Sequence, residues 1–176
     1  MSGVGELYER NARFADGFDK GDLPLKPSLS MIILCCVDAR VSPEHVAGVA
    51  LGDALVIRTA GARVTDGAAL EVRMLWTLMS MATGATPNLE LVIISHTQCG
   101  MERFAVPEIA AKVTEIFGSS DVVDTYAIAD VNEAVSTDIE RLRADASMPR
   151  ELKVSGHVYD IATGQLREVV ATSTLG

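Results

Sequence analysis

Two short polar segments of this chain hold residue types that could bind a metal ion and use it. Residues 36–40 read CVDAR and residues 96–100 read HTQCG, so two cysteines and one histidine are available. Thiolate sulfur and imidazole nitrogen are common ligands of zinc. Three such ligands would leave the fourth tetrahedral position free for water, which is typical of a catalytic rather than a structural site. The two segments together indicate a zinc enzyme.

Each polar segment follows an apolar run that we expect to form a β-strand. Residues 31–34, MIIL, and 91–94, LVII, are short and rich in β-branched side chains. The polar residues therefore lie at the carboxyl ends of two strands. In an open parallel sheet ligands bind at these ends, where segments distant in sequence can meet. We therefore expect Cys36 and His96 to share one metal ion.

Local spacing distinguishes the two consecutive cysteines. Side chains two positions apart in an extended chain point the same way, so Cys36, Asp38 and Arg40 could line one face. Cys35 would then point to the opposite face. The spacing predicts that Cys36 is the metal ligand and that Cys35 is a core residue.

The second segment requires a turn. A turn from His96 to Cys99 would bring the imidazole and the thiolate within reach of one ion. Gly100 is expected to let the backbone pass close by, because glycine has no Cβ. Ser95 and His96 also suggest a nucleophile and a base, but neighbours in a strand point to opposite faces, which argues against a serine hydrolase.

Cys-x-Asp-x-Arg followed by a later His-x-x-Cys resembles the zinc site of the β-class carbonic anhydrases. Two further segments are similar to that family, residues 52–61, GDALVIRTAG, and residues 156–166, GHVYDIATGQL. The resemblance covers roughly residues 30–170 and is closest to the shortest members of the family.

The resemblance implies roles for five residues. One Zn²⁺ per chain would be bound by Cys36, His96 and Cys99, while Arg40 would hold Asp38 away from the metal and leave zinc free to carry hydroxide. The implied reaction is the reversible hydration of CO2 to bicarbonate. The resemblance also implies a homodimer or a dimer-based higher oligomer, in which an N-terminal helix packs on the neighbouring subunit.

Two other functions remain open at this stage. Short family members also resemble carbonyl sulfide hydrolases, and COS is an isostere of CO2 that the same site could hydrolyse to H2S and CO2. A zinc-stabilised interaction protein without turnover is the alternative from another class. Asp38 and Arg40 argue against it, because a structural zinc site fills its fourth position with a fixed ligand and needs neither residue. The two could still be an ordinary ion pair.

Composition sets the outer limits. The 176 residues fit one α/β domain, residues 1–176, with an N-terminal helical arm over residues 1–25. Fifteen Lys and Arg against 24 Asp and Glu give a net charge of −9, which disfavours nucleic acid as a partner. No apolar run reaches the ~20 residues of a membrane span, and the N-terminus does not resemble a signal peptide. We therefore expect a cytoplasmic protein, and three cysteines do not suggest a disulfide framework.

Strand and helix patterns alternate along the chain, which predicts a central, mostly parallel sheet flanked by helices, with an antiparallel edge strand. The expected strands are residues 30–36, 54–58, 89–95, 154–159 and 165–171. The expected helices begin with an arm that ends at residues 20–24 and continue with a short helix opened by residues 42–44 and with residues 66–83, 107–117 and 130–145. The apolar second half of residues 66–83 should be buried in the core or in a subunit interface. His45 and His157 are expected to be structural or surface residues.

Overall fold

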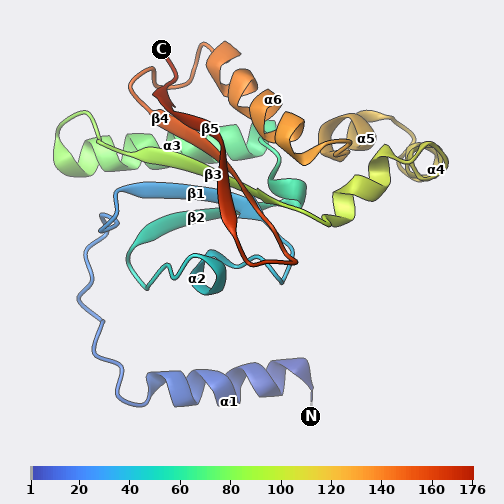
Figure 1. Ribbon diagram of the computed structural model, residues 1–176. Coiled ribbons are helices and arrows are strands. Elements are labelled where there is room, and N and C mark those ends of the chain that lie inside the picture. Colours follow the sequence, from blue (N-terminus) through green and yellow to red (C-terminus); the bar gives the residue numbers. More distant parts are fainter. Residues whose placement is uncertain (1) are drawn as a thin grey trace.

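The computed structural model describes residues 2–176 and contains one five-stranded sheet with strand order β2-β1-β3-β4-β5 (Figure 1). The strands are β1 (Met31–Cys36), β2 (Ala54–Thr59), β3 (Glu90–His96), β4 (Lys153–Tyr159) and β5 (Leu166–Thr174). β1 pairs in parallel with β2 and β3, and β3 pairs in parallel with β4. β5 pairs antiparallel with β4 and forms one edge. The predicted fold class, an α/β fold with an antiparallel edge strand, is confirmed.

Helices connect the four parallel strands, and a turn joins β4 to β5. The α-helices are α1 (Gly3–Ala15), α2 (Pro43–Val46), α3 (Asp66–Thr83), α4 (Pro107–Phe117), α5 (Asp121–Tyr126) and α6 (Val131–Ala144), and the 3-10 helices are η1 (Ala60–Ala62) and η2 (Gly100–Ala105). The limits of α3 and α4 agree with the prediction. α6 begins after Asp130, whose side chain accepts hydrogen bonds from the backbone N–H groups of Asn132 and Glu133. α5 was not predicted, and α1 ends at Ala15, five residues earlier than expected.

The two faces of the sheet are covered differently. The larger core packs α3 and α6 against one face, and Ile32, Leu34, Leu91 and Ile93 point into it. Gly156 of β4 lies beneath α6, where any Cβ would collide with Val135 and Ile139, so glycine allows this close approach. The opposite face carries a smaller cluster formed by Ile33, Cys35, Val92 and Ile94.

The apolar second half of α3 is only partly buried in the single chain. Trp76 and Met79 lie in the core, as expected. Met74, Leu78 and Met81 are 60%, 43% and 79% exposed, so they do not belong to this core. Burial in the core, one of the two predicted alternatives, is therefore wrong for these three residues, whereas burial in a subunit interface stays a prediction.

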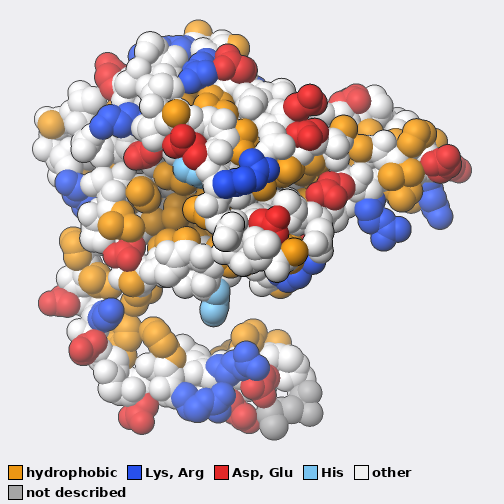
Figure 2. Space-filling model, viewed as in Figure 1, with side chains coloured by type: hydrophobic (Ala, Val, Ile, Leu, Met, Phe, Trp, Pro, Cys, Tyr) orange, Lys and Arg blue, Asp and Glu red, His pale blue; other side chains and the backbone are white. Residues whose placement is uncertain are grey.

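α1 stands apart from the body of the molecule, and residues 16–30 connect it to β1 (Figure 1). No residue of α1 is buried, and Leu7, Tyr8 and Phe14 are exposed. Figure 2 shows hydrophobic side chains on the side of this arm that faces the rest of the molecule. Among the described residues, no helix is long and apolar enough to cross a membrane.

Candidate metal centre

The two polar segments meet where β1 and β3 end. Cys36 is the last residue of β1, His96 is the last residue of β3, and Cys99 follows three residues later. One ligand atom from each of these residues lies within 4.8 Å of the others. The two sulfur atoms are 4.0 Å apart, close to the about 3.8 Å that two Zn–S bonds at a tetrahedral angle would require. The geometry therefore suits one four-coordinate ion.

His96 presents a free ring nitrogen to this cluster. Its side chain is fully buried, and Nδ1 lies 2.9 Å from the carbonyl oxygen of Thr97, to which it can donate a hydrogen bond. Nε2 is buried without a hydrogen-bond partner. A buried polar atom without a partner is costly, whereas a metal ion would use its lone pair. Burial disfavours the imidazolium, but the Cys36 sulfur and the Thr97 carbonyl offset this and raise the pKa of His96.

The hydrogen bond between the sulfur atoms of Cys36 and Cys99 links the ionisation of the two thiols. A hydrogen bond from the Cys99 thiol lowers the pKa of Cys36 against the effect of burial, and the same hydrogen bond raises the pKa of Cys99. One thiolate is thus stabilised by one thiol in the chain alone. A divalent cation would favour the loss of the remaining proton, because metal binding requires deprotonated sulfur.

Cys35 lies on the other face of β1, as the alternation predicts. It is 1% exposed and packs with Ile33 and Ile94 rather than with the ligand cluster. Burial raises the pKa of its thiol to about 11. Cys35 is therefore a core thiol in this fold, in contrast to Cys36.

Asp38 and Arg40 form a two-pronged ion pair beside the cluster. Arg40 Nε donates to Asp38 Oδ1 at 2.9 Å, and Nη2 donates to Oδ2 at 2.6 Å. Arg40 Nη2 also donates to the carbonyl oxygen of Gln98, which links the two polar segments. These bonds lower the pKa of Asp38 well below its usual range. Asp38 Oδ2 lies 4.0 Å from His96 Nε2, so the carboxylate borders the cluster while Arg40 holds it.

The turn between His96 and Cys99 differs from the prediction. Gln98, not Gly100, adopts the left-handed backbone, with φ of 57°. A Cβ at Gly100 would meet no atom within 4 Å, so the expected close approach at this glycine is wrong. Glu102 also acts here, because its side chain accepts a hydrogen bond from the backbone N–H of Cys99 at 3.1 Å. The spacing of a capping box, with Glu three residues after the cap, could have indicated this contact.

A strained segment, η1, lies against β1. Gly61 and Ala62 of η1 both have positive φ, 70° and 58°. The backbone N–H of Gly61 also helps to lower the pKa of Cys36. Positive φ is uncommon for alanine and marks a place where the surrounding structure imposes the backbone conformation. The sequence analysis predicted neither of these two conformations.

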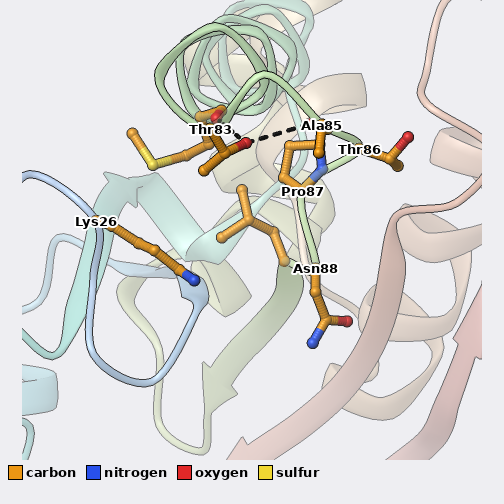
Figure 3. Close-up of a pocket in the computed structure, with 8 residues that line it drawn as sticks. Lys26, Thr83, Ala85, Thr86, Pro87 and Asn88 are labelled. Atoms are coloured by element: carbon orange, nitrogen blue, oxygen red, sulfur yellow. Dashed lines mark hydrogen bonds between the residues drawn. The ribbon is translucent and has the colours of Figure 1, made fainter.

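The remaining histidines lie outside the cluster. His45 is exposed, and His157 is half-buried on β4, with Nε2 3.1 Å from Ser155 Oγ. A cavity of about 210 Å³ lies near the opposite ends of the strands (Figure 3). Its lining is formed by Lys26, Met79, Thr83, Ala85, Thr86, Pro87, Asn88 and Leu89. It has no cysteine or histidine, so it is separate from the candidate metal centre.

Comparison with known proteins supports the resemblance. The family described as "Carbonic anhydrase" matches residues 31–124, which includes both polar segments. The chain belongs to the β-carbonic anhydrase family. Beta-carbonic anhydrase 1 of Mycobacterium tuberculosis is 29% identical over 169 residues, covering 96% of this chain and 99% of the relative. A carbonic anhydrase structure from Streptococcus mutans is 32% identical, with a TM-score of 0.76 and coverage of 96% and 98%.

A second group of relatives is named for a different activity. The carbon disulfide hydrolase of an Acidianus species is 28% identical over 160 residues, covering 77% of this chain and 75% of the relative. The enzyme family to which this chain belongs therefore includes proteins named for two different reactions.

Proposed function

We propose that Cys36, His96 and Cys99 bind one zinc ion. The proposal rests mainly on the buried Nε2 of His96, which has no hydrogen-bond partner, and on the approach of one ring nitrogen of His96 to within 4.8 Å of two sulfur atoms. Two thiolates and one imidazole suit zinc better than magnesium or calcium, which prefer oxygen ligands. Bound zinc supplies Lewis acidity, which lowers the pKa of coordinated water so that a nucleophile forms near neutral pH.

We propose that the protein hydrates CO2 reversibly. In this reaction water adds to carbon and gives bicarbonate, and one proton is released. Family membership and the near-complete coverage of the M. tuberculosis and S. mutans relatives support this substrate. No redox cofactor is required, because no electrons are transferred.

Asp38 and Arg40 would orient the nucleophile. Arg40 occupies both carboxylate oxygens of Asp38 and is anchored to the Gln98 carbonyl, so the carboxylate is fixed at the border of the cluster. Each carboxylate oxygen has more than one lone pair, so Asp38 can still accept a hydrogen bond from the attacking water. The low pKa keeps this group ionised and unable to act as a donor. The pair therefore positions one proton of the nucleophile.

Hydrolysis of a sulfur analogue of CO2 is the second candidate. The similarity to carbon disulfide hydrolases over 77% of this chain favours it specifically. CS2 and COS are linear like CO2. One addition of water to the carbon of COS would give H2S and CO2, and two successive additions would convert CS2 to two H2S and CO2. The positions of Asp38 and Arg40 suit either substrate, because both residues would act on the water.

We also propose that the chain forms a homodimer or a larger assembly built from dimers. The exposed apolar face of α1 supports this, because within one chain it covers nothing. Large apolar side chains gathered on one exposed face are typical of an interaction surface.

One experiment separates the three functions. Purified zinc-loaded protein should be assayed for CO2 hydration by stopped flow and for sulfide release from COS and CS2. Hydration much faster than sulfide release would support the first proposal, and the reverse would support the second. If the protein holds one zinc per chain and turns over none of the three substrates, a zinc-stabilised interaction protein becomes the better description.

A further inference from the structure

Arg58, near the end of β2, contacts the backbone that carries Cys36 and Asp38. Its Nε and Nη2 atoms donate to the carbonyl oxygen of Cys36 at 2.9 and 2.8 Å. Nη2 also donates to the carbonyl oxygen of Asp38 at 2.7 Å. One guanidinium thus makes three hydrogen bonds to two carbonyl groups that are two residues apart. A planar fork of donors is required for this pattern.

The segment is tied down at other points too. The backbone N–H of Val37 donates to the carbonyl oxygen of Thr59 at 3.0 Å, and the N–H of Asp38 donates to Cys36 Sγ at 3.4 Å. The guanidinium of Arg40 holds the Asp38 side chain. The main chain and the side chain of Asp38 are therefore held by two different arginines from two different segments.

We propose that Arg58 is a positioning residue for the metal centre. It fixes the main chain at Cys36 and Asp38, and thereby the direction of one sulfur ligand and of one carboxylate. Arg58 touches neither the substrate nor the reacting atoms in this role. The catalytic part of the inference rests on the proposed function, whereas the structural part concerns only how the segment from Cys36 to Asp38 is held.

The chemistry of the contact explains why arginine is needed. β1 ends at Cys36, so the carbonyl groups of Cys36 and Asp38 lie at and beyond the end of the regular ladder, where other donors are needed. A cationic donor makes stronger hydrogen bonds to carbonyl oxygen than a neutral donor does. Lysine would keep the charge but present a single ammonium centre, which cannot reproduce the three bonds in the same plane.

The test compares zinc-loaded full-length Arg58→Gln and Arg58→Lys with wild type. We expect kcat for CO2 hydration to fall about tenfold or more in Arg58→Gln, since small displacements of a catalytic group can cost up to ~100-fold, while KM stays within about twofold. Zinc transfer to a chromogenic chelator should be at least several-fold faster, because outer contacts of metal ligands affect affinity by roughly 10–100-fold. Arg58→Lys should recover only part of each loss.

Amide hydrogen exchange of residues 36–41 provides a readout that does not depend on turnover. We expect faster exchange at Val37 and Asp38 in both Arg58 variants. Arg167→Gln is the matched control, because Arg167 lies on β5 and donates to Asn132. It should leave all three readouts at wild-type values.

Unchanged zinc transfer and unchanged exchange in Arg58→Gln would overturn the inference, and so would full recovery by lysine. A loss confined to KM would also overturn it, because that would indicate substrate contact. If wild type itself is inactive on CO2, COS and CS2, the proposed reaction fails, but zinc transfer and exchange still decide the role of Arg58.

Discussion

The metal centre and the N-terminal arm differ in where their side chains find partners. Cys36, His96 and Cys99 are buried and contact one another at the ends of two paired strands. α1 has no buried residue, although Leu7 and Phe14 share one of its faces. The centre is therefore completed by contacts within one chain, whereas the apolar face of the arm is not.

This difference separates two kinds of stabilisation. At the centre, strand pairing brings the ligands together before any ion binds, so little chain entropy remains to be lost on metal binding. In the arm, isolated helices of this length are marginal in water, and a partner surface is needed to stabilise them. Changes at the centre should therefore affect metal and turnover, and changes in the arm should affect assembly.

The largest expected effect is loss of the metal. Replacing Cys36 or Cys99 by serine removes a thiolate and leaves a neutral hydroxyl that binds zinc poorly. We expect zinc content to fall from one per chain to nearly none in Cys36→Ser and Cys99→Ser, with loss of turnover. Elemental analysis after dialysis measures this directly. Full zinc in both variants would show that the ligand set is wrong.

The next effect concerns turnover without loss of metal. Arg40→Ala frees the Asp38 carboxylate from its place, and Asp38→Ala removes the carboxylate. Both variants should keep zinc but lose about 100-fold or more in kcat, the size typical of lost orientation and proton positioning. Stopped-flow CO2 hydration and sulfide release from COS and CS2 measure this effect.

A matched control is available elsewhere on the molecule. Arg141 Nη2 and Asp66 Oδ1 form an exposed ion pair of the same 2.6 Å length. Arg141→Ala should change stability by at most about 1 kcal/mol and leave kcat unchanged. If Arg40→Ala kept wild-type rates on the preferred substrate, the ion pair of Arg40 with Asp38 would contribute as little to catalysis as the surface pair.

The sequence predicted the parts of the centre that depend on regular structure. Strand alternation separates Cys36 from Cys35, and the ends of β1 and β3 place Cys36 near His96. The left-handed backbone of Gln98 and Ala62 was not predictable, because neither residue type favours positive φ and the fold imposes it. Arg58 also gave no signal, since its partners are carbonyl groups, which every residue carries.

Outside the metal centre, prediction from the sequence likewise depended on how regular the pattern of each element is. The helix over residues 130–145 was predicted because apolar residues, among them the buried Val135, Ile139 and Leu142, recur there at helical spacing. The six residues of α5 are too few to show such a period and lack a buried member. The exposed side of α3 could not be distinguished from its core side, because both sides are apolar.

Changes in the arm should weaken self-association and leave the metal centre intact. Removing residues 2–18 deletes the apolar face of α1, so we expect the dimer to dissociate at concentrations where wild type is assembled, with zinc retained. Sedimentation velocity at matched concentrations measures this. A double substitution, Leu7→Ser with Phe14→Ser, should weaken assembly in the same direction without removing the helix.

The control for this face uses polar residues of α1 that lie outside it. Around the helix axis Glu9 lies about 160° from Leu7 and about 140° from Phe14, and Arg13 lies about 120° and about 100° from them. Glu9→Ser with Arg13→Ser should therefore leave assembly unchanged. If the truncated protein sediments like wild type, the interface lies elsewhere, and the exposed side of α3 becomes the next surface to test.

The smallest effect is expected at Cys35, the buried thiol that faces away from the metal centre. Cys35→Ala should keep zinc and turnover and lower the free energy of unfolding by about 1 kcal/mol near neutral pH.

Burial raises the pKa of this thiol to about 11, from 9.0 for the unperturbed group. The unfolded chain therefore releases this proton first as pH rises, and wild type loses stability between pH 9 and 11, by at most about 3 kcal/mol. Cys35→Ala has no thiol proton to release, so it does not share this loss. The difference in unfolding free energy between wild type and Cys35→Ala should therefore shrink or reverse between pH 9 and 11. Chemical denaturation of both proteins at pH 7, 9 and 11 measures it, and a constant difference would show that the thiol does not titrate as a buried group.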